Sequence, residues 1–189
     1  RGILPFLDNE AELAGVLGHE IGHVTARHSA QQYTRQISGQ VGLIALQVFV
    51  PQARPFGQMS SQALGVLFLR YGRDDELQAD QLGAGYEATL GWDPAGASAF
   101  LSTLGRLAEA AGDRRGVPNW LSTHPDPLSR VRDIQPTVDA LTSIGGNYVT
   151  NRDEWLGRID GVVYGDNPEQ GLARGNVFLH PVLRFRIDF

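Results

Sequence analysis

Apolar residues near the start of the chain recur at intervals of three and four positions. Asn9 is suited to cap a helix that begins just after it, and Glu12 completes a capping box with Asn9. The pattern predicts an amphipathic helix whose apolar face carries four residues: Leu13, Val16, Leu17 and Ile21.

A second helix is predicted from about Met59 to Leu90, where Gly91 stops it. Its expected core residues are Leu64, Leu67 and Phe68. This helix and the next one along the chain would pack around the first predicted helix.

A third helix opens at Asp93 and Pro94 and ends at Gly112. Its inward residues are expected to be Phe100, Leu101, Leu104 and Leu107. In the loop that follows, Trp120 could line a substrate cleft or anchor packing.

Residues Ile37 to Val50 form an apolar run that is followed by Pro51, Pro55 and Gly57. The run is shorter than the roughly 20 residues that span a bilayer. Three interpretations remain open: a buried helix, which we favour, a flap over a site, and a surface that contacts a membrane or a partner.

After Pro136 the pattern changes. Asn151 and Glu154 resemble a capping box for a short helix through Ile159. The segment from Asn176 to Phe189 alternates like a strand, although Pro181 interrupts it, and its partner sheet is expected beyond the end of the sequence. Its expected inward residues are Val177, Leu179, Leu183, Phe185 and Ile187. We therefore predict a core over residues 1–136 and a C-terminal appendage of helix and strand over residues 137–189.

Composition narrows the possible chemistry. The 189 residues are 42% hydrophobic and 20% charged, which suits one principal globular domain. A net charge of −5 without basic clusters argues against nucleic acid binding. The chain has no cysteine and no lysine, which excludes disulfides, thiolate chemistry and a Schiff base.

Residues 19–23 read His-Glu-Ile-Gly-His within the first predicted helix. Side chains four residues apart share one helix face, so His19 and His23 can converge on one zinc ion. Glu20 points slightly around the helix and is placed to act on a water molecule at the metal as a general base. A helix with two surface histidines is the alternative for this motif alone.

A catalytic zinc site needs a third protein ligand and an open fourth position. Glu76 is our candidate ligand, and Asp80 lies one turn later, where it could accept the second ring N–H of a ligand histidine. The alternative is that Asp74, Asp75 and Glu76 form a solvated first turn favoured by the helix dipole.

Three motifs in order carry a family resemblance: GHEIGHVTARH over residues 18–28, ELQAD over residues 76–80, and Thr123-His124-Pro125 with Arg130 six residues after the histidine. They resemble the zinc metallopeptidase family of the CAAX prenyl protease, the HtpX heat-shock protease and the periplasmic BepA-type proteases, all gluzincins. The matching motifs run from Arg1 to about Val131.

The resemblance implies a mainly α (α+β) fold with a zincin-like core of helices packed around the HExxH helix. It implies one Zn²⁺ per chain, held by His19, His23 and Glu76, with Glu20 as catalytic base and Asp80 behind the ligands. The choice of Glu76 over Asp75 depends on this resemblance.

The resemblance also gives a role to His124, which would either bind zinc in a resting form or stabilise the oxyanion of the reaction. From the residues alone it could be a loop histidine before Pro125, with Asp126 capping a helix that begins at Pro127. Arg130 would anchor the His124 loop through a carboxylate near the site. We interpret His28 and His180 as structural or surface residues.

The expected reaction is hydrolysis of peptide bonds without a covalent intermediate. In the family, upstream sequence supplies a sheet whose edge strand binds the substrate, so we expect this stretch alone to bind zinc and cleave poorly. Relatives suggest quality control of unfolded polypeptides in the bacterial periplasm or envelope, with possible membrane contact through Ile37–Val50. An inactive zinc-binding chaperone or adaptor is the main alternative, and a structural zinc module is a weaker one.

Overall fold

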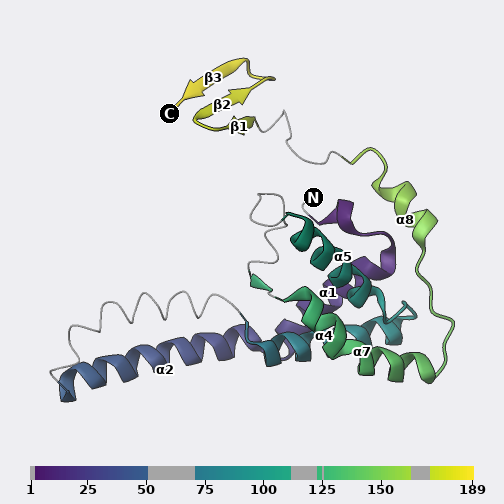
Figure 1. Cartoon of the computed structure of the whole chain (residues 1–189), viewed down its shortest axis with the longest axis horizontal. Helices are drawn as coiled ribbons and strands as arrows, with labels where there is room; N and C mark the ends of the chain where they lie inside the picture. Colours follow the sequence, from purple (N-terminus) through teal and green to yellow (C-terminus); the bar gives the residue numbers. More distant parts are fainter. Residues whose placement is uncertain (1–2, 51–70, 112–122, 125, 163–170) are drawn as a thin grey trace.

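The computed structural model describes residues 3–50, 71–111, 123–124, 126–162 and 171–189. The fold is mainly helical, as predicted, with a small antiparallel sheet at the C-terminal end (Figure 1). The helices are η1 (Leu4–Phe6), α1 (Glu10–Thr25), α2 (His28–Phe49), α4 (Arg73–Leu90), α5 (Gly96–Ala111), α7 (Pro127–Ser143) and α8 (Arg152–Ile159). The strands are β1 (Leu172–Arg174), β2 (Val177–His180) and β3 (Phe185–Asp188).

The first helix begins as predicted. The side chain of Asn9 accepts a hydrogen bond from the N–H of Glu12 at 2.9 Å. The Glu12 carboxylate reaches back to the N–H of Asp8 at 2.9 Å, one residue before the capping residue. The predicted apolar face is only partly buried, because Leu17 and Ile21 remain 53% and 52% exposed.

Helices α1 and α4 lie antiparallel and unusually close to each other. A Cβ added to Gly18 would come within 3.0 Å of the Gly83 Cα, and one added to Gly22 would lie 2.8 Å from the Ala79 carbonyl oxygen. Small residues on both helices therefore permit backbone contact. This contact sets His19 and His23 directly opposite the N-terminal turns of α4.

The prediction of one continuous helix from Met59 to Leu90 is wrong, and its expected start lies outside the described residues. Tyr71 and Gly72 are not helical, and α4 begins at Arg73. Gly72 caps it, since the Asp75 carboxylate accepts a hydrogen bond from the Gly72 N–H at 3.3 Å. Leu64, Leu67 and Phe68 lie outside the described residues. The helix ends as predicted at Gly91, whose φ of +83° favours glycine.

The main core forms where α1 and α5 meet the N-terminal segment and α8. Phe100, Leu101 and Leu104 of α5 are buried as predicted, whereas Leu107 is half-buried. Trp155 of α8 joins this core and donates a hydrogen bond from its indole nitrogen to the Leu7 carbonyl at 2.9 Å. Gly112 and Trp120 lie outside the described residues. The predicted division after residue 136 falls inside α7, and the packed body continues to α8; where a domain boundary lies stays a prediction.

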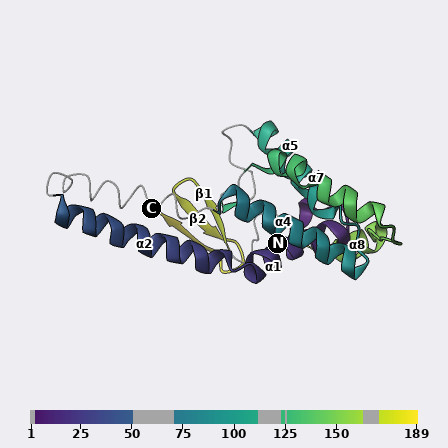
Figure 2. The ribbon, with the colours of Figure 1, turned by 90° about the horizontal axis from the view of Figure 1, so that it is seen from below.

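Helix α2 projects from the helical body instead of being buried in it, so the favoured interpretation of Ile37–Val50 is wrong (Figures 1 and 2). Val41, Ile44 and Phe49 are 59%, 63% and 82% exposed. The described part of the helical body does not extend along α2, so nothing within it covers these side chains. Among the described residues, we find no helix that is both long and apolar enough to cross a membrane.

The C-terminal part differs from prediction in two ways. Helix α8 forms, but Asn151 adopts a φ of +50° and does not cap it with its side chain. The Asn151 amide instead donates a hydrogen bond to the Glu10 carboxylate at 3.1 Å, and Glu154 forms an ion pair with Arg158. The single predicted strand is instead two strands, β2 and β3, joined by a turn that contains Pro181.

The sheet order is β1-β2-β3, so each of the three strands has a partner within the chain, whereas the prediction places the partner sheet elsewhere. Most of the residues expected to face inward are exposed, with Leu183 at 66% and Ile187 at 50%.

Candidate metal centre

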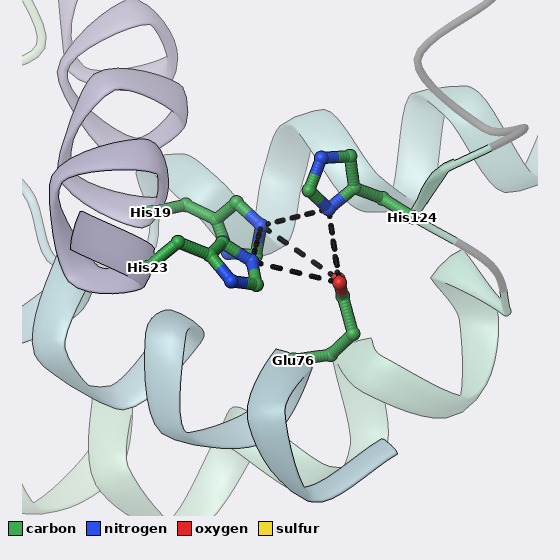
Figure 3. Close-up of side chains that lie close together, drawn as sticks. All are labelled: His19, His23, Glu76 and His124. Atoms are coloured by element: carbon green, nitrogen blue, oxygen red, sulfur yellow. Dashed lines mark hydrogen bonds and ion pairs between the residues drawn. The ribbon is translucent and has the colours of Figure 1, made fainter. Parts of the chain in front are cut away.

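Four predicted site residues meet in one cluster (Figure 3). His19 and His23 come from α1, Glu76 comes from α4, and His124 comes from the segment just before α7. Each offers one ligand atom, these atoms all lie within 4.8 Å of one another, and all four residues are buried.

The ligand atoms face one common point. The Nε2 atoms of His19 and His23 are 3.0 Å apart, and the Nδ1 atom of His124 lies 3.2 Å from His19 Nε2. A Glu76 oxygen lies 3.0 Å from His124 Nδ1 and 3.5 Å from His23 Nε2. Three nitrogen atoms and one oxygen atom that can each bind a metal therefore lie close together.

Behind the cluster, Asp80 fixes the orientation of His19. Its Oδ1 atom lies 2.8 Å from His19 Nδ1. Burial alone would raise the pKa of Asp80, but hydrogen bonds from Arg130 and His19 outweigh burial and lower the pKa below its usual value. An ionised carboxylate only accepts hydrogen bonds, so the proton of the His19 ring is on Nδ1 and its Nε2 lone pair faces the cluster.

Arg130 joins the two carboxylates of α4. Its Nε and Nη2 atoms donate to the two oxygens of Asp80 at 2.9 and 2.6 Å, and its Nη1 lies 2.8 Å from a Glu76 oxygen. The guanidinium is buried and holds Glu76 and Asp80 in place from α7. It contacts these carboxylates from the helix that directly follows the His124 segment.

Asp126 does not cap α7 with its side chain, contrary to prediction. Its φ is +55°, and its carboxylate accepts a hydrogen bond from Arg73 at 3.3 Å instead. The helix nevertheless begins at Pro127, whose missing N–H is no loss at this position.

The residues fit a divalent metal ion. Burial, followed by the neighbouring His19, His124 and His28 rings and Arg130, lowers the pKa of His23 to about 3, so its imidazole is neutral. Two imidazoles whose Nε2 atoms lie 3.0 Å apart, together with a glutamate, form the donor set that zinc prefers. A cation between these atoms would relieve the repulsion between them.

Glu20 lies beside the cluster and not in it. Its side chain is 45% exposed, and its Oε1 atom is 3.5 Å from His124 Nε2. The Glu20 carboxylate is therefore accessible from solvent beside the cluster.

The acidic run at the start of α4 is not a solvated face throughout. Asp74 is exposed, but Asp75 and Glu76 are buried. Asp75 forms an ion pair with Arg35 at 3.2 Å and is not among the four cluster residues.

Sequence reasoning missed two residues at the cluster. His28 is only 1% exposed, and its Nδ1 lies 2.9 Å from His23 Nδ1. The ring of Tyr71 lies 4.0 Å from the His23 ring and 5.6 Å from the His124 ring, measured between centroids. His28 follows His23 by five residues, which does not match the spacing of a shared helix face, so nothing in the sequence indicated this contact. His180 lies apart from the cluster on β2.

The fold and the site together define a zincin-like centre, in which an HExxH helix packs against a helix that carries a glutamate. The chain belongs to peptidase family M48, because the model of that family matches residues 1–138. This match includes every residue of the cluster.

Named relatives agree with this assignment. The chain is 36% identical over 146 residues to a beta-barrel assembly-enhancing protease of Yersinia pestis, covering 72% of this chain and 29% of that protein. It is 34% identical over 131 residues to the mitochondrial metalloendopeptidase OMA1 of Arabidopsis thaliana, covering 68% of this chain and 25% of that protein. The chain thus spans less than a third of the length of these relatives.

Proposed function

We propose that this chain is the catalytic part of a zinc-dependent endopeptidase. The observation that carries the proposal is the buried cluster of His19, His23, Glu76 and His124, with the Glu20 carboxylate beside it. Membership of peptidase family M48 and relatives named as proteases support the same activity.

His19, His23 and Glu76 would hold the metal. When bound, zinc supplies a Lewis acid that polarises the scissile carbonyl and makes water more acidic. Glu20 takes the proton from the attacking water and passes it to the leaving amine, since its carboxylate lies next to the cluster and is open to solvent, whereas that of Glu76 is buried. Arg130 and Asp80 keep Glu76 and His19 oriented during these transfers.

His124 is best explained as a resting ligand. Its Nδ1 atom lies among the other donors, and its Nε2 atom faces Glu20. With a metal bound by His19, His23 and Glu76, the His124 ring would take the fourth ligand position beside Glu20, which supports a self-inhibited form. Turnover would require His124 to move, after which it could stabilise the oxyanion.

The substrates we propose are unfolded or misassembled polypeptides of the bacterial envelope. The support is the similarity to proteins named beta-barrel assembly-enhancing proteases. The exposed apolar side chains of α2 support a peripheral contact with a membrane or an envelope complex through Ile37–Val50. The second candidate is a zinc-binding chaperone or adaptor without turnover, favoured by the position of His124.

The test is hydrolysis of an unfolded protein by the zinc-loaded full-length protein. We expect Glu20→Gln to abolish cleavage, because it removes the base and keeps the shape of the side chain. We expect His124→Ala to cleave at least as fast as the wild type if the ring blocks the fourth position. Zinc binding without cleavage by the wild type or by His124→Ala would favour the chaperone or adaptor.

A further inference from the structure

We propose that His28 and Gln78 act as a positioning pair that fixes the proton of His23 on Nδ1 and turns its Nε2 lone pair toward the metal. The inference rests on the proposed zinc site. It assigns to the second ligand histidine the support that Asp80 gives to the first.

The hydrogen bonds form a chain that runs from Gln78 to the cluster. The Nε2 atom of His28 lies 2.9 Å from the carbonyl oxygen of Gln78, which only accepts hydrogen bonds, and an Asp75 oxygen lies 3.9 Å from the same Nε2 atom. In the neutral form of the ring, the proton of His28 is therefore on Nε2. Its Nδ1 atom is then an acceptor, and it lies 2.9 Å from His23 Nδ1. A hydrogen bond at that place requires the proton of His23 on Nδ1.

The opposite protonation would compete with metal binding. If His23 carried its proton on Nε2, that N–H would donate to His19 Nε2 at 3.0 Å and close the site. His23 Nδ1 would then face the acceptor Nδ1 of His28, and two acceptors 2.9 Å apart repel each other. His28 therefore destabilises the protonation state that would have to be undone before a metal binds.

The local sequence places His28 for this role. Helix α1 ends at Thr25, and Arg27 adopts a left-handed φ of +58° before α2 begins at His28. The break turns the first residue of α2 back toward His23, which an uninterrupted helix would not do at a spacing of five residues. His28 is 1% exposed, so water does not replace this contact.

The two ligand histidines are thus supported in chemically different ways. His19 donates to a carboxylate that is held by Arg130, whereas His23 donates to a neutral ring. The neutral pair orients His23 without adding another negative charge to the buried cluster of Glu76 and Asp80. The support of a ligand by such partners is generally worth about 10- to 100-fold in metal affinity.

The experiment compares His28→Phe with His28→Asn. Phenylalanine keeps a ring but has no acceptor, whereas the Asn oxygen can occupy the place of the His28 Nδ1 atom. His180→Phe is the matched control, because His180 lies on β2 away from the cluster. The readouts are the protonated ring nitrogen of His23, from long-range ¹⁵N NMR of the metal-free protein, zinc affinity, and the visible spectrum of the cobalt-loaded protein.

We expect wild-type His23 to carry its proton on Nδ1. We expect His28→Phe to bind zinc about 10- to 100-fold more weakly and to change the cobalt spectrum, with His28→Asn restoring most of the affinity. A wild-type His23 protonated on Nε2 would overturn the proposal. Equal zinc affinities of the wild type and His28→Phe would also overturn it, and so would a folded His28→Asn protein that does not regain zinc affinity. None of these readouts needs peptidase activity. A chain that binds no zinc would refute the proposed function, but the NMR measurement would still show which nitrogen of His23 carries the proton.

Discussion

Glu87 is a carboxylic acid inside the helical core and is 1% exposed. Burial raises its pKa to about 9; the backbone N–H of Ala97 lowers the pKa and the Asp93 carboxylate raises it further, both by less than burial does. The side chain is therefore neutral in the folded protein at pH 7. Below about pH 4.5, Glu87 is protonated in both the folded and the unfolded chain, and its contribution to the free energy of unfolding is fully present. This contribution is lost as the pH rises toward 9, because the unfolded chain releases the proton at a lower pH than the folded chain does.

We therefore expect Glu87→Gln to stabilise the protein at pH 8 and to have little effect near pH 4.5. Glutamine is neutral at every pH. Near neutral pH, the free energy of unfolding of Glu87→Gln should therefore exceed that of the wild type by on the order of 3 kcal/mol. Chemical denaturation at the two pH values measures it, with the exposed Glu109→Gln as control. An equal effect of Glu87→Gln at both pH values would show that the buried carboxyl is not protonated as described.

Arg130 is the buried cation that holds two carboxylates of α4. Arg130→Met removes the positive charge that neutralises Glu76 and Asp80, and breaking a buried ion pair from one side costs about 3–5 kcal/mol. The control is Arg73→Met, whose ion pair with Asp126 is exposed and is worth at most about 1 kcal/mol. Denaturation curves of both variants test this, and similar losses of stability in the two would contradict the role given to Arg130.

At the scale of elements, the contact between α1 and α4 sets the distance between the ligands. Gly22→Ala would bring a methyl group within 2.8 Å of the Ala79 carbonyl, so we expect a loss of about 1–3 kcal/mol and weaker zinc binding as the helices separate. Gly85→Ala is the matched control on α4, since nothing lies within 4 Å of its added Cβ, and it should stabilise by about 0.5–1 kcal/mol. Unchanged zinc affinity in Gly22→Ala would mean that this contact does not position the ligands.

Elements with strong local signals could be predicted from the sequence. The Asn9 cap, the stop at Gly91 and the core face of α5 each depend on residues a few positions apart. The start of α4 could not be predicted, because the apolar run before it continues the helical pattern and only the Gly72–Asp75 cap marks the break.

Tertiary context accounts for the other differences. Whether the apolar side chains of α2 are buried depends on which elements cover them, and the two strands near Pro181 depend on pairing across a turn. At the site, HExxH and the downstream glutamate follow from spacing, with the choice of Glu76 taken from the family resemblance. His28 could not be identified, because its position depends on the left-handed backbone at Arg27.

At the scale of the whole molecule, a metal ion would join three segments that are distant in sequence: α1, α4 and the His124 segment. A ligand that binds only the folded state stabilises that state by mass action. At a free ligand concentration of 100 times its Kd, the free energy of unfolding rises by about 2.7 kcal/mol. We expect chelation to lower the melting temperature of the wild type and to leave His23→Ala unchanged. His180→Ala should respond to chelation as the wild type does, and a response of His23→Ala equal to the wild type would place the stabilising metal elsewhere.

The most direct test of the metal centre is anomalous diffraction at the zinc edge from crystals of the zinc-loaded protein. We expect one strong peak about 2.0–2.2 Å from the Nε2 atoms of His19 and His23 and from a Glu76 oxygen. His124 Nδ1 should complete the coordination in the resting form. A peak bound by other residues, or no peak at this cluster in protein that contains one zinc per chain, would contradict the account.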